Sequence, residues 1–102
     1  MALLITADGT EQEVQPNNPR KGFELQEVYR LTDCETIQAI ECKTPYGTMM
    51  IMDDEGKIHC KPVNKKATEY WAKKWKTTPE ELLKTGDHIV GDVLLVFSKE
   101  FK

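Results

Sequence analysis

The apolar runs in this sequence are short, and none is longer than five residues. A membrane-spanning helix needs about 20 consecutive apolar residues, so the sequence predicts a protein without such a helix. One of the longest runs, residues 93–97, is rich in branched and aromatic side chains, which is typical of a buried strand. The chain is therefore expected to build its core from short strands and amphipathic helices.

Length and composition favour one folded domain. The 102 residues are close to the modal size of a domain, so we expect residues 1–102 to form a single domain. Hydrophobic residues make up 39% of the chain, which is too apolar for a disordered protein. The first apolar run has no basic flank, so it does not match a signal peptide, and we expect a cytoplasmic protein.

The first half of the chain begins with a hairpin signal. Asp8-Gly9 follows the first apolar run, and both residue types tolerate the positive φ angles of a tight turn. The sequence therefore predicts a hairpin made by residues 2–6 and 10–14.

A helix is predicted after this hairpin. In residues 23–31 apolar side chains recur at spacings of three and four, which predicts a helix that covers a sheet.

A second hairpin is predicted in the middle of the chain. Pro45-Tyr46-Gly47 is a turn sequence between two strand-like runs, residues 36–43 and 48–53. After the next turn, apolar and polar residues alternate in residues 57–61, which predicts a third strand. The central part of the sheet is thus expected to be a three-stranded meander.

The second half of the chain predicts two helices and a final strand. Asn64 is a good N-cap, and residues 65–76 contain no glycine or proline. Thr78, Pro79 and Glu81 are typical of the start of another short helix. Residues 88–97 are apolar on both faces and are expected to lie centrally in the sheet. The predicted class is α+β, a mostly antiparallel sheet with the two main helices packed on one face.

The titratable residues form no recognisable catalytic or metal set. Cys34, Cys42 and Cys60 contain no Cys-X-X-Cys pair, and neither His59 nor His88 completes a ligand cluster. We therefore expect reduced thiols, no metal and no cofactor. Without a nucleophile, base and orienting group in a known pattern, the sequence favours a non-enzymatic role and indicates no catalytic residue.

Charge is unevenly distributed along the chain. Residues 61–76 contain six lysines and one glutamate, a local charge of +5, whereas the rest of the chain sums to −8, which gives −3 in total. One interpretation is the solvated basic face of an amphipathic helix whose other face carries Ala67, Trp71 and Trp75. Extended nucleic acid is not an expected partner, because a net acidic chain repels the phosphates that flank a single basic stripe.

The other interpretation is a site for a phosphorylated small ligand, such as a cyclic nucleotide. Asn64 caps a helix whose amides and positive dipole end attract an anion. Lys61, Lys65 and Lys66 supply positive charge beside it, and Tyr70 is a candidate to stack on a base.

Gly91 and Asp92 are the candidates for the opposite wall of that site. Asp92 interrupts an apolar strand, where a buried carboxylate without a partner is costly. It either faces outward near a bulge at Gly91 or lines a ligand pocket.

A protein-binding role is the alternative. Tyr70, Trp71 and Trp75 supply aromatic anchors, and the neighbouring lysines supply a polar rim, as in many interface hot spots. The partner would be a second copy of the chain or another protein.

Four groups of residues, most of them in predicted turns or in the predicted core, are similar to those of a known family. They are Asp8-Gly9 with Val14 and Pro16, residues 53–57, Pro62-Val63-Asn64 with Ala67-Thr68, and residues 89–93. With them the chain resembles a short domain carried mainly by phages and mobile elements, domain of unknown function 3846. The resemblance implies no established catalytic residues. Its phage association implies a role against host defence in the host cytoplasm, either by sequestering a nucleotide signal or by inhibiting a host protein.

Overall fold

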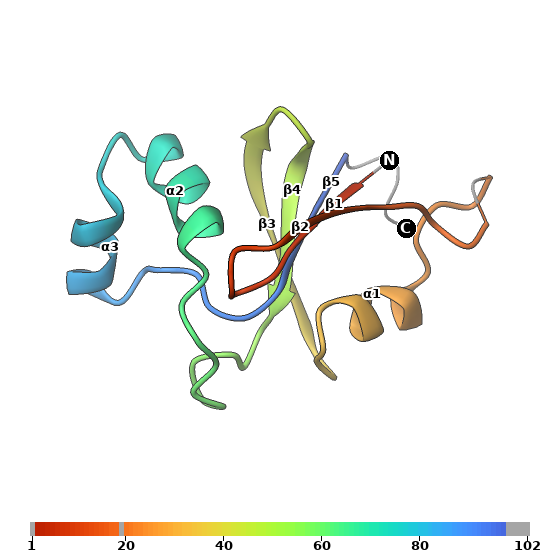
Figure 1. Ribbon diagram of the computed structural model, residues 1–102, viewed down its shortest axis with the longest axis horizontal. Helices are drawn as coiled ribbons and strands as arrows, with labels where there is room; N and C mark the ends of the chain where they lie inside the picture. Colours follow the sequence, from red (N-terminus) through yellow and green to blue (C-terminus); the bar gives the residue numbers. More distant parts are fainter. Residues whose placement is uncertain (1, 19, 98–102) are drawn as a thin grey trace.

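The computed structural model describes residues 2–18 and 20–97, and in these residues five antiparallel strands form one sheet with three helices (Figure 1). The strand order is β2-β1-β5-β4-β3. The strands are β1 (Ala2–Ile5), β2 (Glu11–Val14), β3 (Ile37–Thr44), β4 (Gly47–Asp53) and β5 (Val93–Val96). The helices are α1 (Leu25–Leu31), α2 (Lys65–Lys74) and α3 (Pro79–Thr85). The predicted α+β class and mostly antiparallel sheet are confirmed.

The predicted hairpin between β1 and β2 is confirmed. Its turn is closed by the Thr6 amide, which donates to the Thr10 carbonyl at 2.9 Å, and by Asp8 Oδ1, which accepts from the Thr10 amide at 3.0 Å. Gly9 has a φ of 97°, which glycine adopts without a steric penalty. All four residues of β1 are buried, which places this strand inside the sheet.

The last strand is central, as predicted, because β5 lies between β1 and β4. It begins at Val93 rather than near residue 88. Gly91 has a φ of 76°, so the chain leaves the extended conformation just before β5. Val90 forms only an isolated bridge with Val63.

The second hairpin, β3 with β4, is also confirmed. Gly47 begins β4 where the end of β5 approaches it closely, since a Cβ at this position would lie 2.3 Å from the carbonyl oxygen of Val96. Only glycine fits that contact without moving the backbone of β5.

The predicted third strand at residues 57–61 is wrong. Residues 54–60 form successive turns, in which the His59 amide donates to Glu55 at 3.0 Å and the Cys60 amide to Lys57 at 3.2 Å. The edge of β4 that this strand would have needed is paired with β5. The meander is therefore completed by β5, from the other end of the chain, and not by the next segment.

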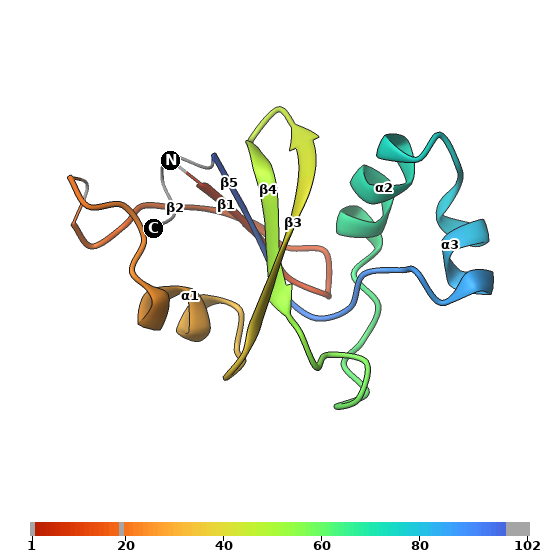
Figure 2. The same ribbon diagram turned by 180° about the vertical axis from the view of Figure 1, so that it is seen from behind.

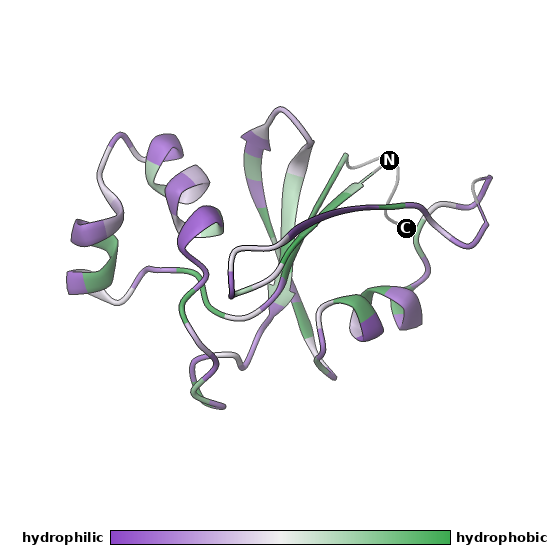
Figure 3. Ribbon diagram, viewed as in Figure 1, coloured by the Kyte–Doolittle hydropathy of each residue, from purple (hydrophilic) through white to green (hydrophobic). Residues whose placement is uncertain are grey.

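The two main helices lie on opposite faces of the sheet, so the prediction that both pack on one face is also wrong (Figures 1 and 2). Successive residues of a strand point to opposite faces. In β5, Val93 belongs to the same buried cluster as Ala67 of α2, whereas Leu94 belongs to the cluster that contains Val28 of α1. Figure 3 shows the apolar residues concentrated along β1 and β5, between the helices. A sheet that is apolar on both faces needs a cover on each.

Local signals define the ends of the helices on the α2 side. α2 ends just before Lys76, which has a φ of 54°. The Thr78 hydroxyl oxygen accepts from the Glu81 amide at 3.3 Å, which confirms the predicted cap of α3, and Gly86 ends that helix with a φ of 82°. None of the helices in the described residues is long and apolar enough to cross a membrane.

Candidate functional site

Asn64, the predicted cap of α2, is completely buried and fully hydrogen-bonded. Its Oδ1 accepts from the Ala67 amide at 3.0 Å, which is the N-cap interaction. Its Nδ2 donates to the carbonyl oxygens of Ile5 and Gly91, each at 2.9 Å. Its main-chain amide donates to Ile89 at 2.8 Å. Asn64 therefore joins the start of α2 to β1 and to the segment that enters β5.

Two of the three lysines predicted to hold a phosphate face carboxylates. Lys66 Nζ lies 2.9 Å from Glu11 Oε1 on the edge strand β2. Lys61 Nζ lies 2.9 Å from Asp53 Oδ2 at the end of β4. Lys65 is exposed to solvent.

Asp92 contacts the first hairpin. It is half-buried, and its Oδ1 accepts from the main-chain amide of Ala7 at 3.0 Å, so it anchors the β1–β2 turn. Gly91 lies against the side chain of Lys61, because a Cβ at residue 91 would lie 3.0 Å from Lys61 Cδ.

The structure thus brings Lys61, Asn64 and Gly91 together, but their polar groups are engaged in internal contacts. Lys66 lies on the outer surface with Glu11 beside it. A phosphate at the start of α2 would meet this carboxylate as well as the lysines, and like charges at short range repel.

Asp53 is the most buried carboxylate near these lysines, with 2% of its side chain exposed. Burial alone would raise its pKa, but the hydrogen bonds from Lys61 and the Glu55 amide outweigh burial and hold the pKa below its ordinary value. His59 Nδ1 also lies 3.5 Å from Asp53 Oδ2. This carboxylate is an ionised structural group that ties the turn after β4 to the sheet.

The three predicted interface aromatics differ in exposure. Tyr70 and Trp71 are partly buried against the core of the sheet, and burial raises the pKa of the Tyr70 phenol. Trp75 is 58% exposed and meets Trp71 edge to face, with ring centroids 5.6 Å apart. Lys74 Nζ lies 5.2 Å from the Trp71 centroid and 5.5 Å from that of Trp75. Trp75 is therefore the aromatic of this group that a partner can reach.

One hollow adjoins these rings between α2 and α3. It has a volume of about 440 Å³, and its lining combines apolar side chains with hydroxyl and carboxylate groups. The lining residues are Trp71, Trp75, Thr77, Glu81, Leu82, Thr85 and Asp87.

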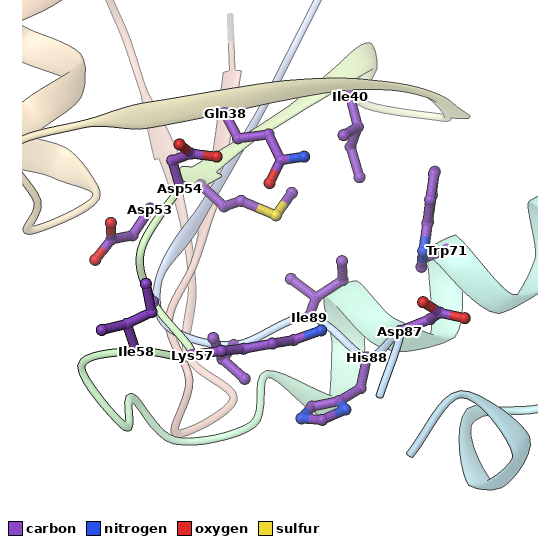
Figure 4. A pocket seen from close by; sticks show the side chains of 13 residues that line it. Gln38, Ile40, Asp53, Asp54, Lys57, Ile58, Trp71, Asp87, His88 and Ile89 are labelled. Carbon is purple, nitrogen blue, oxygen red and sulfur yellow. The ribbon is translucent and has the colours of Figure 1, made fainter. Parts of the chain in front are cut away.

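A second hollow lies on the sheet side of Trp71, between β3, the turns after β4 and the segment before β5 (Figure 4). Its volume is about 250 Å³. Trp71 and Asp87 line both hollows. Sequence reasoning missed both: the second hollow joins segments far apart in the chain, and the first, within residues 71–87, depends on how α3 lies against α2. The only sequence signal was the tryptophan pair.

A third, open hollow lies beside the end of α1 and includes Cys34, Asp53 and Lys61. Burial raises the pKa of the Cys34 thiol, and the same holds for the buried Cys42. A thiol with a raised pKa is a weak nucleophile at neutral pH. Within residues 2–18 and 20–97, no group of three His, Cys, Asp or Glu side chains is placed to hold a metal ion.

Comparison with known proteins gives one match. The model of a family described as domain of unknown function (DUF3846) matches residues 1–101. No match was found among curated proteins or among solved structures. The match covers nearly the whole chain and agrees with the resemblance carried by the turn and core residues.

Proposed function

The chain belongs to the domain of unknown function 3846 family, and we propose that it acts as a non-enzymatic binding protein that holds a segment of a partner protein in the hollow between α2 and α3. The observation that carries the proposal is Trp75, 58% exposed at the edge of that hollow. Large aromatic side chains are enriched at protein interfaces and dominate the binding energy there.

The lining of this hollow indicates the chemistry of the partner. Trp71, Trp75 and Leu82 are the apolar residues of the lining, and they suit one apolar side chain of a partner. Glu81 and Asp87 are the charged residues of the lining, and both are acidic. A partner segment with an apolar anchor next to a lysine or arginine fits this combination, because the cation meets a carboxylate while the anchor leaves water.

α3 also carries an exposed apolar side chain. Leu83 is 47% exposed, one residue after the buried Leu82. It does not line the hollow, so the contacts proposed for the partner are those with Trp71, Trp75 and Leu82. Energetically important contacts of this kind are usually few and clustered.

A phosphorylated ligand at the start of α2 stays a prediction with less support from the geometry. Asn64 uses its side chain internally, and Glu11 sits beside Lys66. The role against host defence, and a host protein as the partner, likewise stay predictions that rest on the resemblance to phage-borne domains.

Selection from a displayed library of random peptides tests the proposal, because it requires no candidate partner. We expect peptides with an aromatic or aliphatic residue next to a lysine or arginine. Their Kd should rise at least about tenfold in Trp75→Ala, the size of effect typical of a hot-spot residue. Tyr46→Ala is the matched control, since Tyr46 is an exposed aromatic in the β3–β4 turn. Peptides that bind Trp75→Ala as tightly as the wild type would refute the proposal.

A further inference from the structure

The hollow on the sheet side of Trp71 has an apolar floor. Met52 and Ile89 are each 5% exposed, and Ile40 packs beside them on the same buried cluster. Trp71 stands at one side, where Figure 4 shows its ring edge-on. A floor of aliphatic side chains with an aromatic wall favours a ligand with a flat apolar body.

Carboxylates lie on both sides of this floor. Figure 4 shows Asp54 near Gln38 on one side and Asp87 below Trp71 on the other. Asp87 Oδ2 accepts from the Thr85 hydroxyl at 3.1 Å, which leaves its second oxygen for another donor. Two carboxylates at the edges of an apolar hollow suit a ligand that carries N–H donors.

The positive charge of Lys57, which lines the hollow, does not cancel the charges of these two carboxylates. Lys57 extends along the hollow, but its ammonium donates to the main-chain carbonyl of Gly86. The other lining carboxylate, Asp53, is paired with Lys61. The two carboxylates of Asp54 and Asp87 and the one ammonium group of Lys57 leave the hollow with a net negative charge. It therefore attracts cations and repels phosphates or carboxylates.

His88 also belongs to the lining, but Figure 4 shows its ring directed away from Trp71 and Ile40. Its Nδ1 is buried without a hydrogen-bond partner among the described residues, so a ligand in the hollow does not reach this atom.

From the apolar floor, the two carboxylates and the negative charge we propose that this hollow binds a small organic cation with a flat ring, of the aryl amidine or aryl amine class. The ring lies on the aliphatic floor beside Trp71, whose face attracts cations. The charged group meets Asp54 at one edge of the floor, and Asp87 at the other edge adds to the negative potential. The volume of about 250 Å³ is slightly below the roughly 300 to 1,000 Å³ of most ligand pockets, which limits the ligand to one or two rings. This hollow shares Trp71 and Asp87 with the proposed partner site, whereas Asp54 and Gln38 line this hollow and not the other, so a change at Asp54 distinguishes the two sites.

Isothermal titration calorimetry with benzamidine as the probe tests this assignment. Benzoate and benzamide are matched probes with negative and zero charge. We expect saturable one-to-one binding of benzamidine, weaker binding of benzamide and no binding of benzoate. Asp54→Asn should raise the Kd for benzamidine at least about fivefold, because it removes a charged acceptor and keeps the shape of the side chain.

The control variant is Glu35→Gln, which removes the same charge from an exposed side chain outside this hollow. It should leave the Kd unchanged within about twofold at physiological salt, because an exposed charge that does not contact the ligand is largely screened. Three results would overturn the proposal: benzoate binding as tightly as benzamidine, equal effects of Asp54→Asn and Glu35→Gln, or no saturable benzamidine binding up to about 10 mM. Asp54 is exposed, so its amide variant keeps the fold, and circular dichroism verifies this.

Discussion

The side-chain amide of Asn64 donates a hydrogen bond to the carbonyl oxygen of Gly91 across 2.9 Å, 27 residues away in the chain. The same amide group reaches the carbonyl of Ile5 in β1. One buried side chain thus joins the start of α2, the helix that leads to Trp71 and Trp75, to β1 and to the segment that enters β5. The geometry of the α2 surface depends on this junction.

Asn64→Ala should destabilise the protein strongly. It removes an N-cap, worth about 1 kcal/mol, and leaves two buried carbonyl groups unsatisfied, each costing about 1 kcal/mol or more. We expect a loss of about 3 kcal/mol in the free energy of unfolding, measured by urea denaturation. Lys65→Ala, at the exposed neighbouring position, is the control and should cost less than about 0.5 kcal/mol. Similar losses in the two variants would contradict the structural role assigned to Asn64.

Gly47→Ala should disturb the contact between β4 and β5. The added Cβ would meet the backbone of Val96 at 2.3 Å, and a main-chain atom inside a sheet cannot move aside cheaply. We expect a loss of about 2 kcal/mol or more, which lowers the melting temperature of a domain of this size by about 8 °C or more. Pro45→Ala, two residues earlier and exposed, should change it less. A melting temperature within about 2 °C of the wild type for Gly47→Ala would show that the strands are further apart than described.

The ion pair of Asp53 and Lys61 predicts a pH dependence of stability. The folded-state pKa of Asp53 lies below its ordinary value of 3.8. Its contribution is therefore fully present above the ordinary value and is lost as the pH falls through the lowered folded value. The stability difference between wild type and Asp53→Asn should be constant from neutral pH to about pH 5 and shrink below about pH 4.

Urea unfolding at a series of pH values measures this difference. Asp33→Asn, at an exposed position, is the comparison variant. A wild-type advantage over Asp53→Asn that grows as the pH falls would contradict the assigned direction of the pKa.

Nucleotides should not stabilise the protein strongly. Glu11 beside Lys66 weakens the attraction of the α2 start for phosphate. Thermal-shift measurements with millimolar cyclic and linear nucleotides should give shifts below about 1 °C, whereas a ligand at 100 times its Kd would add about 2.7 kcal/mol. A larger shift that disappears in Lys65→Glu would establish the phosphate site and displace the α2–α3 hollow as the main binding site.

Much of the fold was predictable because its signals are local. Asp8-Gly9 and Pro45-Tyr46-Gly47 specify turns through their own backbone preferences, and Thr78 specifies a cap through its own hydroxyl. Residues 57–61 show the limit of such signals. Ile58 and Cys60 alternate with polar residues as in a strand, yet Ile58 is 75% exposed, because both edges of β4 are already paired.

The side of the sheet on which a helix packs was not predictable in the same way. Alternation in β5 shows that both faces are apolar, but it does not say which helix covers which face. The candidate site depends even more on tertiary contacts. The cap at Asn64 was predicted, whereas its bonds to Ile5 and Gly91 and the hollow on the sheet side of Trp71 join segments that are distant in sequence. The α2–α3 hollow lies within residues 71–87, but it depends on how α3 lies against α2.

Chemical-shift mapping of the isotopically labelled protein with a selected peptide is the most direct test of the proposed function. We expect the largest amide shifts on titration around the α2–α3 hollow, at Trp71, Trp75, Thr77, Leu82 and Thr85. Trp75→Ala should abolish these shifts at the same peptide concentration. Shifts concentrated at Lys65, Lys66 and β2, with the α2–α3 hollow unaffected, would contradict a partner site between the two helices.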